Sequence, residues 1–304
     1  MSNNIHIIPS QKIDRAKWDN CINQSSNAMI YACSYYLDAM ADNWSGIIVN
    51  DYEAVMPVPW RKKLGIKYCY DVPFIQQLGW YCQSGTVDAN TLLLQLFSFV
   101  KYGDYSFNYH NALQAAGIKQ QNNYTIDLSQ PHASVVENYT TDAVNNIKKA
   151  SQVYLSYHTA HWSTALESYQ RWYGKRLHNV SAKDYANFNA LIKILEEKEQ
   201  VFARKVMNDS NGNILSIALF LKDKSRIYNI MNSTPEAGRK TGANHYLLDN
   251  VFKEFAGSGL VFDFEGSDIP GIKAFYEKFG AENQGYPKLG TFNHLPFPLR
   301  LLKR

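Results

Sequence analysis

The sequence predicts a mixed α+β protein made of two domains with the same order of elements. Its 304 residues exceed the roughly 250 to 300 at which a single hydrophobic core stops growing. In the second half, patterns typical of helices precede three strands, a loop, a helix, a strand, a second helix and a last strand. The first half repeats this order more loosely. Together these observations predict a duplicated domain, each copy a mixed, mostly antiparallel sheet flanked by helices.

The start of the second half is predicted to be a helix followed by a three-strand meander. Ser181 and Asp184 have the spacing of a capping box, and apolar residues follow at helical spacing through residue 200. Strands are predicted over 201–207, 214–222 and 226–232. The polar turns between them are typical of hairpins, so the three strands are expected to pair antiparallel.

The remaining elements follow from the same periodicities. After a loop that ends at residue 243, a helix is predicted from Asn244 to Glu254 and slightly beyond. A strand over 259–266, a helix over 269–280 and an extended segment over 288–295 complete the second half. In the first half we expect helices at 14–23, 34–42 and 88–102 and strands at 44–50, 53–61, 65–71 and 105–110.

The boundary between the domains is predicted near Asn138. Pro131 and polar residues break the pattern between 127 and 150 before a new helix begins. We therefore expect an N-terminal domain over 1–138, on the acceptor side, and a C-terminal domain over 139–304 that carries the donor loop and the catalytic candidates.

Composition restricts the classes of function. An apolar share of 45% and a charged share of 19% are those of an ordinary globular protein. A net charge of +4 tolerates an anionic ligand without requiring nucleic acid. The four cysteines all lie in the first third without paired spacing, which argues against a disulfide framework or a zinc site. With no export signal or membrane-length apolar run, the expected location is the cytoplasm.

A basic, glycine-containing turn before the helix at Asn244 is the first candidate site. A helix N-terminus offers unpaired amide groups and a partial positive charge, and glycine lets the backbone approach phosphate oxygens. The candidate cofactor-binding residues are Arg239, Lys240, Thr241, Gly242, Ala243 and Asn244. The alternative interpretation is a turn with a C-cap glycine.

Two carboxylates in the strand over 259–266 are the second candidate. Alternation along a strand puts Asp263 and Glu265 on one face, opposite Phe262 and Phe264. Carboxylates on an inner strand are costly unless they are paired, solvated or used. They can take a proton from an attacking amine or bind its ammonium form. The alternative is a structural ion pair with Arg226 or Arg239.

The first half offers an acceptor-side candidate. Cations lie beside aromatic and amide side chains over 60–77, an arrangement that suits an acceptor bearing a phosphate or carboxylate. The predicted substrate-binding residues are Trp60, Arg61, Lys62, Tyr70 and Gln77. The alternative is a solvated turn. No glycine-rich basic loop precedes the helix from Asp88, so we expect no cofactor site in this half.

Histidines supply only a weak metal signal. His158 and His161 are three residues apart and would share a helical face, but no carboxylate-histidine motif surrounds them. We favour histidines at a helix entry and predict no metal site.

The segment R-x-x-G-x-N-x-x-L-L at 239–248 resembles the acetyl-CoA-binding segment of the GCN5-related N-acetyltransferase (GNAT) superfamily. That pattern is Gln/Arg-x-x-Gly-x-Gly/Ala, and Asn244 stands at its last position. Ala274, Tyr276 and Gly280 are similar to the helix after the fifth strand of these acetyltransferases. The resemblance implies that Tyr276 protonates the departing thiolate. The alternative role is a half-buried aromatic residue of an amphipathic helix.

Segments 142–150, 241–255 and 260–282 together resemble Fem-type (FemABX) transferases, which carry two GNAT-like domains in one chain. The resemblance implies transfer of an acyl or aminoacyl group to an amine, with the acceptor in a cleft of the domains. In cell-wall members the helix usually reads Phe-Lys, and the lysine is tied to handling aminoacyl-tRNA. Here the pair is Phe275 and Tyr276, which favours a thioester donor.

The predicted function is therefore an acyl-CoA-dependent N-acyltransferase that acts on a small-molecule or cell-wall-precursor amine. One alternative is a Fem-like transferase that uses aminoacyl-tRNA to modify a peptidoglycan precursor, with tRNA as a partner. The other, suggested by Asn244, is a binding protein on the same fold without catalysis. The oligomeric state is left open.

Overall fold

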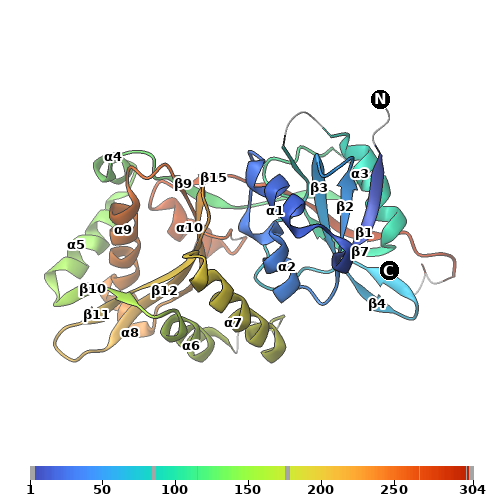
Figure 1. Ribbon diagram of the computed structural model, residues 1–304. Coiled ribbons are helices and arrows are strands. Elements are labelled where there is room, and N and C mark those ends of the chain that lie inside the picture. The colour runs from blue at the N-terminus through green and yellow to red at the C-terminus, as the bar shows by residue number, and fades with distance from the viewer. Residues whose placement is uncertain are drawn as a thin grey trace. The chain divides into compact units, whose positions relative to one another are not determined.

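The structure is a computed structural model that describes residues 4–83, 87–114, 116–174, 179–266, 268–298 and 300. The chain forms two compact units (Figure 1). Unit 1 comprises Met1–Gln121, Ala186–Leu191 and Gly285–Arg304, and unit 2 comprises Asn122–Tyr185 and Ile192–Gln284. Helices flank mostly antiparallel sheets in both, which confirms the predicted fold class.

The main sheet of unit 1 is antiparallel and largely buried. Its strand order is β1 (Ile5–Pro9), β2 (Trp44–Val49), β3 (Ala54–Pro59) and β6 (Tyr81–Cys82). The helices α1 (Arg15–Gln24), α2 (Ser34–Met40) and α3 (Ala89–Phe99) accompany it, with short 3-10 turns at Ser10–Lys12 and Ile30–Ala32. Trp18 of α1 is fully buried against β2, and a Cβ at Gly46 would lie 2.4 Å from its ring. Glycine is thus required where the helix approaches the strand.

Two smaller sheets complete unit 1. The hairpin β4 (Arg61–Lys63) and β5 (Ile66–Tyr68) forms one of them. In the other, β16 (Tyr286–Asn293) lies between β7 (Tyr102–Ser106) and β8 (Ile118–Gln121). The last strand of the chain therefore belongs to the first unit.

Unit 2 contains a seven-stranded sheet. Its order is β10 (Leu155–Ala160), β11 (Val201–Asn208), β12 (Ile214–Lys222), β13 (Arg226–Ser233), β14 (Val261–Asp263), β9 (Tyr124–Asp127) and β15 (Glu282–Asn283). The β11–β12–β13 meander is antiparallel as predicted, whereas β13 and β14 are parallel. The parallel pairing covers only three residues of β13, so β13 continues beyond β14.

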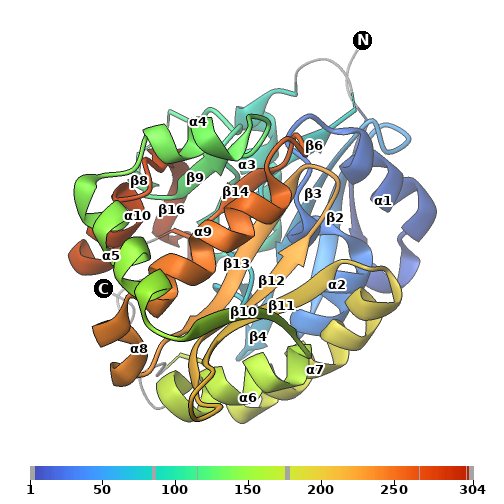
Figure 2. The ribbon, with the colours of Figure 1, turned by 90° about the vertical axis from the view of Figure 1, so that its left-hand side faces the viewer.

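Helices cover the sheet of unit 2. They are α4 (His132–Glu137), α5 (Thr141–Gln152), α6 (Trp162–Tyr173), α8 (Glu236–Thr241), α9 (Ala243–Phe255) and α10 (Pro270–Glu277). The helix α7 (Ala182–Glu197) belongs to both units, because Ala186–Leu191 pack in unit 1. Figure 2 shows α9 lying along the sheet with α5 beside it. Leu247, Val251 and Phe252 of α9 are fully buried against strand residues such as Phe220 and Phe262. Burying such side chains stabilises the fold by about 1.5–3 kcal/mol each.

Side-chain hydrogen bonds cap the N-termini of several helices. The capping box of Ser181 and Asp184 is present at the start of α7. Asp14 and Asp88 cap α1 and α3 by accepting hydrogen bonds from backbone amides of the first turn.

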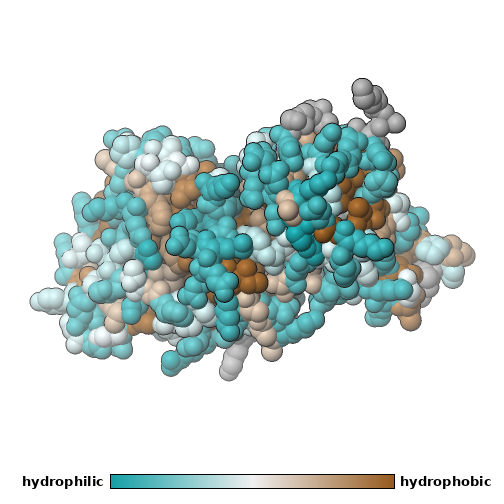
Figure 3. Space-filling model, viewed as in Figure 1, coloured by the Kyte–Doolittle hydropathy of each residue, from teal (hydrophilic) through white to brown (hydrophobic). Residues whose placement is uncertain are grey.

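In the part of the chain that is described, no helix has the length and apolar character to cross a membrane. Hydrophilic residues cover most of the face seen in Figure 3.

The structure differs from the sequence analysis at the change-over between the halves. β9 pairs with β14 and β15, so residues 122–138 already pack in unit 2, ahead of the predicted boundary near Asn138. β16 similarly joins unit 1 from the far end of the chain. Periodicity identifies a strand but not its partner, and both pairings join segments distant in sequence.

Two further differences concern unit 2. The loop predicted before residue 243 contains α8, which begins after Pro235 and carries the i,i+4 ion pair of Glu236 and Lys240. The strand β10 and the helix α6 were not predicted. Their histidines do not share a helical face: His158 lies on β10, and His161 is the N-cap of α6, where it accepts a hydrogen bond from the Ser163 amide. The helix-entry interpretation is therefore correct for His161 and wrong for His158.

Candidate functional site

A cavity of about 760 Å³ lies within unit 2. Its wall is formed by residues of α6, β13, α8, α9 and α10 and of the segments that join them. The lining residues are Tyr169, Tyr173, Asn229, Asn232, Thr234, Gly238, Arg239, Gly242, Asn244, His245, Ile269, Gly271, Ile272, Phe275 and Tyr276. The volume is that of a typical small-molecule site. The lining joins segments that the sequence analysis selected separately.

The predicted cofactor-binding segment divides between the cavity and its surroundings. Arg239, Gly242 and Asn244 line the cavity. Lys240 is exposed and pairs with Glu236, with 2.7 Å between Nζ and Oε1. Thr241 donates its hydroxyl to carbonyls of the preceding helical turn, and Ala243 is fully buried in the core. One side of this segment, with Arg239, Gly242 and Asn244, therefore faces the cavity.

Close packing explains why glycine stands at Gly238 and Gly242. A Cβ at Gly238 would lie 1.7 Å from the carbonyl oxygen of Leu215. Gly242 has a φ of +75°, and a Cβ there would lie 2.5 Å from the carbonyl oxygen of Asn146. These approaches require glycine whether or not a phosphate binds. The C-cap interpretation is also realised, because Gly242 ends α8 in the left-handed conformation.

Arg239 and Asn244 are held in place by hydrogen bonds. Arg239 donates from Nη1 to the carbonyl oxygen of Thr234 over 2.7 Å. Asn244 accepts at Oδ1 from the hydroxyl of Ser216 over 3.1 Å. Gly242 is also the N-cap of α9 and supplies no side-chain cap, and the first turn of α9 contains no acidic residue. The N-terminus of α9 therefore keeps its partial positive charge beside the cavity.

Tyr276 lines the same cavity from α10. Its ring stacks on Phe264 with 4.3 Å between the centroids, which fixes its position. Burial raises the pKa of Tyr276 well above its ordinary value, and the negative charges of Glu265 and Asp263 raise it further. Tyr276 is thus protonated at neutral pH and can donate a hydrogen bond.

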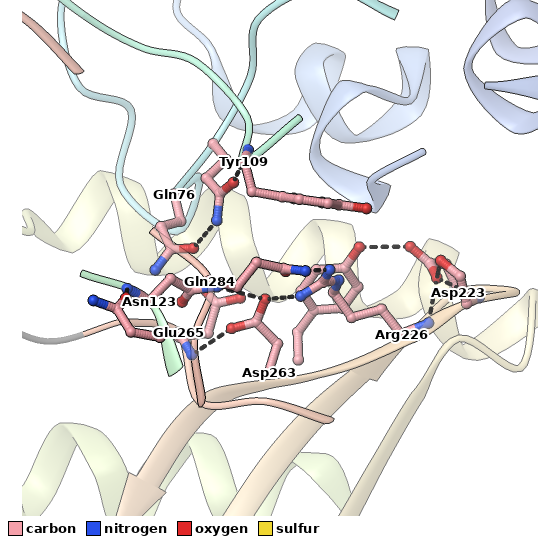
Figure 4. Close-up of polar contacts among 12 residues, drawn as sticks. Gln76, Tyr109, Asn123, Asp223, Arg226, Asp263, Glu265 and Gln284 are labelled. Atoms are coloured by element: carbon pink, nitrogen blue, oxygen red, sulfur yellow. Dashed lines mark hydrogen bonds and ion pairs between the residues drawn. The ribbon is translucent and has the colours of Figure 1, made fainter. Parts of the chain in front are cut away.

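The carboxylate of Asp263 is fully buried in a polar network (Figure 4). Its Oδ2 lies 2.5 Å from Nη1 of Arg226 and accepts a second hydrogen bond from Asn123 over 3.1 Å. Its Oδ1 accepts the backbone amide of Glu265. Arg226 in turn donates to Gln284 over 2.8 Å. The ion pair with Arg226, one of the two alternatives, is the arrangement found, and Asp263 does not line the cavity.

Glu265 does not share a strand face with Asp263. β14 ends at Asp263, and Glu265 follows with a φ of +67°, so strand alternation no longer applies to it. Phe262 and Phe264, predicted to share a face, are both buried in one cluster with centroids 5.0 Å apart. Glu265, like Asp263, is not among the described lining residues.

His245 lines the cavity and was missed by the sequence analysis. Burial and, to a smaller extent, the charge of Lys278 lower its pKa to about 4, against the opposing effect of Asp142. Its Nε2 has no hydrogen-bond partner among the described residues, and its ring contacts Phe275 and Phe279. It is a neutral imidazole at pH 7. Its place directly after Asn244 in the motif was the available signal.

Asn229 and Asn232 were also missed. Both lie on β13 and line the cavity. Polar amides that interrupt the otherwise apolar strand segment over 226–232 were the signal that could have found them.

The acceptor-side candidates in unit 1 are engaged in local contacts. Arg61 pairs with Asp42 over 2.5 Å and stacks 3.8 Å above the ring of Tyr70. Trp60 donates to the hydroxyl of Ser45, and the fully buried Gln77 accepts the backbone amide of Tyr109. Lys62 is exposed on β4. The structure therefore brings Arg61 and Tyr70 together, and the substrate-binding role of this set stays a prediction.

Comparison with solved structures identifies the fold. FemX superposes with a TM-score of 0.69 over 100% of both chains at 14% identity. A tandem GNAT protein from the clavulanic acid biosynthesis pathway has a TM-score of 0.54, 11% identity and coverage of 96% of this chain and 99% of that one. The C-terminal domain of a putative lysylphosphatidylglycerol synthetase from Agrobacterium fabrum has a TM-score of 0.53 and 10% identity. The match covers 95% of this chain and 94% of that one.

The chain therefore has the tandem GNAT-like fold shared with FemX, as the sequence resemblance implied. No known protein family matches the sequence, and no curated protein matches it either. The likeness concerns the fold, and function has to be argued from the cavity.

Proposed function

We propose that the protein is a transferase that forms an amide by moving an acyl group from coenzyme A to an amine, and that the cavity of unit 2 is its reactive site. The observation that supports this most strongly is that Arg239, Gly242 and Asn244 line the same cavity as Tyr276. The two segments are separated along the chain, and each was selected from sequence for one half of such a reaction.

The end of the cavity beside Arg239, where we place the donor, suits an anion. Arg239 contributes a guanidinium that is already oriented by its bond to Thr234. The uncapped N-terminus of α9 adds a partial positive charge beside it. We propose that these groups hold the phosphates of the donor. The exposed Lys240 lies outside the lining, and its charge is paired with that of Glu236.

His245 and Tyr276 line the part of the cavity where we place the reaction. The amine nitrogen forms a bond to the acyl carbon as the bond from that carbon to sulfur breaks. The neutral imidazole of His245 accepts a hydrogen bond from the attacking amine, and the proton that nitrogen loses passes to solvent. The protonated Tyr276 donates to the departing sulfur and regains its proton from solvent. Asp263 and Glu265 influence Tyr276 through their charge rather than from the cavity wall. Holding both reactants together supplies much of the remaining rate.

Aminoacyl-tRNA is the second candidate donor, because the fold is shared with FemX over the whole chain. The acceptor would then be the amine of a peptidoglycan precursor. This alternative predicts binding of aminoacyl-tRNA that weakens steeply with salt, as phosphate contacts release counterions. Absence of such binding at low salt would remove it.

The test is a transfer assay with a matched pair of variants. Purified protein is supplied with acetyl-CoA, longer acyl-CoAs or aminoacyl-tRNA and a panel of amines, and product is measured by mass spectrometry. We expect Tyr276→Phe to reduce transfer by about 10²-fold or more with donor affinity unchanged. Tyr154→Phe, at an exposed tyrosine outside the cavity, should transfer at the normal rate.

Equal rates in the two variants would contradict the role of Tyr276. Donor binding without transfer to any amine would instead favour a binding protein that has kept the fold but not the chemistry.

A further inference from the structure

An irregularity in β13 places two asparagine side chains on one face of the strand. Ala218 pairs with Asn232 and Lys222 pairs with Ile227, and the register shifts between Leu219 and Leu221. Because of this shift, one residue of β12 faces two of β13. Asn229 and Asn232 are three apart, a spacing that regular alternation would send to opposite faces. With the shift both point to the same face, and both line the cavity.

The two side chains carry complementary groups that have no partners among the described residues. Asn229 is only 6% exposed, and its buried Oδ1 accepts no hydrogen bond from the part of the chain that the structure describes. The Nδ2 of Asn232 is likewise buried and has no partner among the described residues. An unmet buried polar group costs about 1–3 kcal/mol, and such groups are uncommon in native proteins. Both residues line the cavity, so an acceptor and a donor without described partners belong to the side chains that border it, and a ligand could supply those partners.

Ser216, Thr234 and Arg239 already have hydrogen-bond partners, whereas Nε2 of His245 on the same lining has none among the described residues. Ser216 bonds to Thr234 and to Asn244, and Arg239 bonds to the carbonyl oxygen of Thr234. Arg239 is the charged residue of the described lining, while Tyr169, Ile272 and Phe275 are among its apolar and aromatic members. The pair thus offers a neutral donor and acceptor on a wall that is otherwise largely apolar.

We propose that Asn229 and Asn232 bind a secondary amide of the ligand. The ligand N–H donates to Oδ1 of Asn229, and its carbonyl oxygen accepts from Nδ2 of Asn232. This inference rests on the proposed function, in which this cavity is the reactive site. It adds that the site selects for an amide group, through side chains rather than through the charged groups near Arg239.

A secondary amide can come from either of two ligands. It is present in the pantetheine arm of a thioester donor and in the backbone of a peptide acceptor. Pantetheine, which lacks the nucleotide and its phosphates, is the probe for the first source. N-acetyl-alanyl-alanine amide is the probe for the second. Calorimetric titration with each distinguishes them.

The variants replace the amides by apolar groups of similar size. Asn229→Leu and Asn232→Leu should each weaken binding of the probe that the wild type binds by about three- to tenfold, the contribution of one hydrogen bond. Their melting temperatures should be equal to or higher than that of the wild type, because an unmet buried group is removed. Asn145→Leu, at an exposed position of α5, is the control and should bind normally. If a leucine variant fails to fold, the alanine variant at that position replaces it.

Unchanged affinity in the folded variants would overturn the inference, and so would failure of both probes to bind the wild type. The proposed function is tested separately. If transfer from acetyl-CoA depends on Tyr276 but not on the two asparagines, the function stands and the amide site does not. If a probe binds through the asparagines and no donor supports transfer, the amide site stands and the function does not.

Discussion

Nη1 of Arg226 lies 2.5 Å from Oδ2 of Asp263, and both side chains are buried. The pair joins the first residue of β13 to the last residue of β14. Beyond it β14 ends, whereas β13 continues to Ser233 and supplies Asn229 and Asn232 to the cavity wall. The ion pair therefore connects the two parallel strands over the short stretch in which they pair.

Removing one charge of this pair should be costly. We expect Asp263→Asn to lower the free energy of unfolding by about 3–5 kcal/mol, because it leaves the buried guanidinium of Arg226 without its counter-charge. Urea denaturation measures the change. Asp51→Asn, which breaks an exposed pair with Lys17, is the control and should leave the stability nearly unchanged. Similar small effects of both substitutions would show that the buried pair is dispensable.

Gly238 should tolerate no side chain. Gly238→Ala forces a methyl group toward the carbonyl oxygen of Leu215, and we expect a loss of about 1–3 kcal/mol from overpacking. Gly174→Ala is the matched control, since no atom lies within 4 Å of its added Cβ. Thermal unfolding measures the melting temperature of each variant, and we expect that of Gly238→Ala to be the lower one. Equal melting temperatures would mean that packing does not require the glycine.

His245 should make stability depend on pH. Its pKa is lowered to about 4 in the folded protein from an ordinary value of 6.5. Between these values the unfolded chain binds a proton that the folded protein does not, so the free energy of unfolding falls as pH falls. The contribution is fully present above about pH 6.5 and is lost by about pH 4.

His245→Gln lacks this titration. The difference in stability between the wild type and the variant should therefore shrink or reverse as pH falls from 7 to 4, as followed by urea denaturation at each pH. A difference that stays constant across this range would contradict the lowered pKa.

Local features of the fold were accessible from sequence. The capping box at Ser181 and the β11–β12–β13 meander could be predicted because each depends on neighbouring residues. The partners of β9 and β16 could not, because their pairing joins residues far apart in the chain.

The site, like the fold, was predictable where it depends on short sequence motifs. The segment around Arg239 and the helix of Tyr276 were chosen from motifs, and the structure places them on one cavity. Asp263 could not be assigned from sequence, since only the structure shows that Arg226 takes up its charge. The shared orientation of Asn229 and Asn232 depends on a register shift against β12, which strand periodicity does not reveal.

The central claim is that the segment from Arg239 to Asn244 binds the donor from inside the cavity. Its most direct test is a calorimetric titration of the wild type, Arg239→Ala and Lys240→Ala with acetyl-CoA, with melting temperatures as a check on folding. Arg239 lines the cavity, and Lys240 pairs with Glu236 outside the lining. We expect saturable binding by the wild type, loss of about tenfold or more in affinity for Arg239→Ala, and near-normal affinity for Lys240→Ala. Binding that both folded variants retain, or no binding of acetyl-CoA by the wild type, would contradict it.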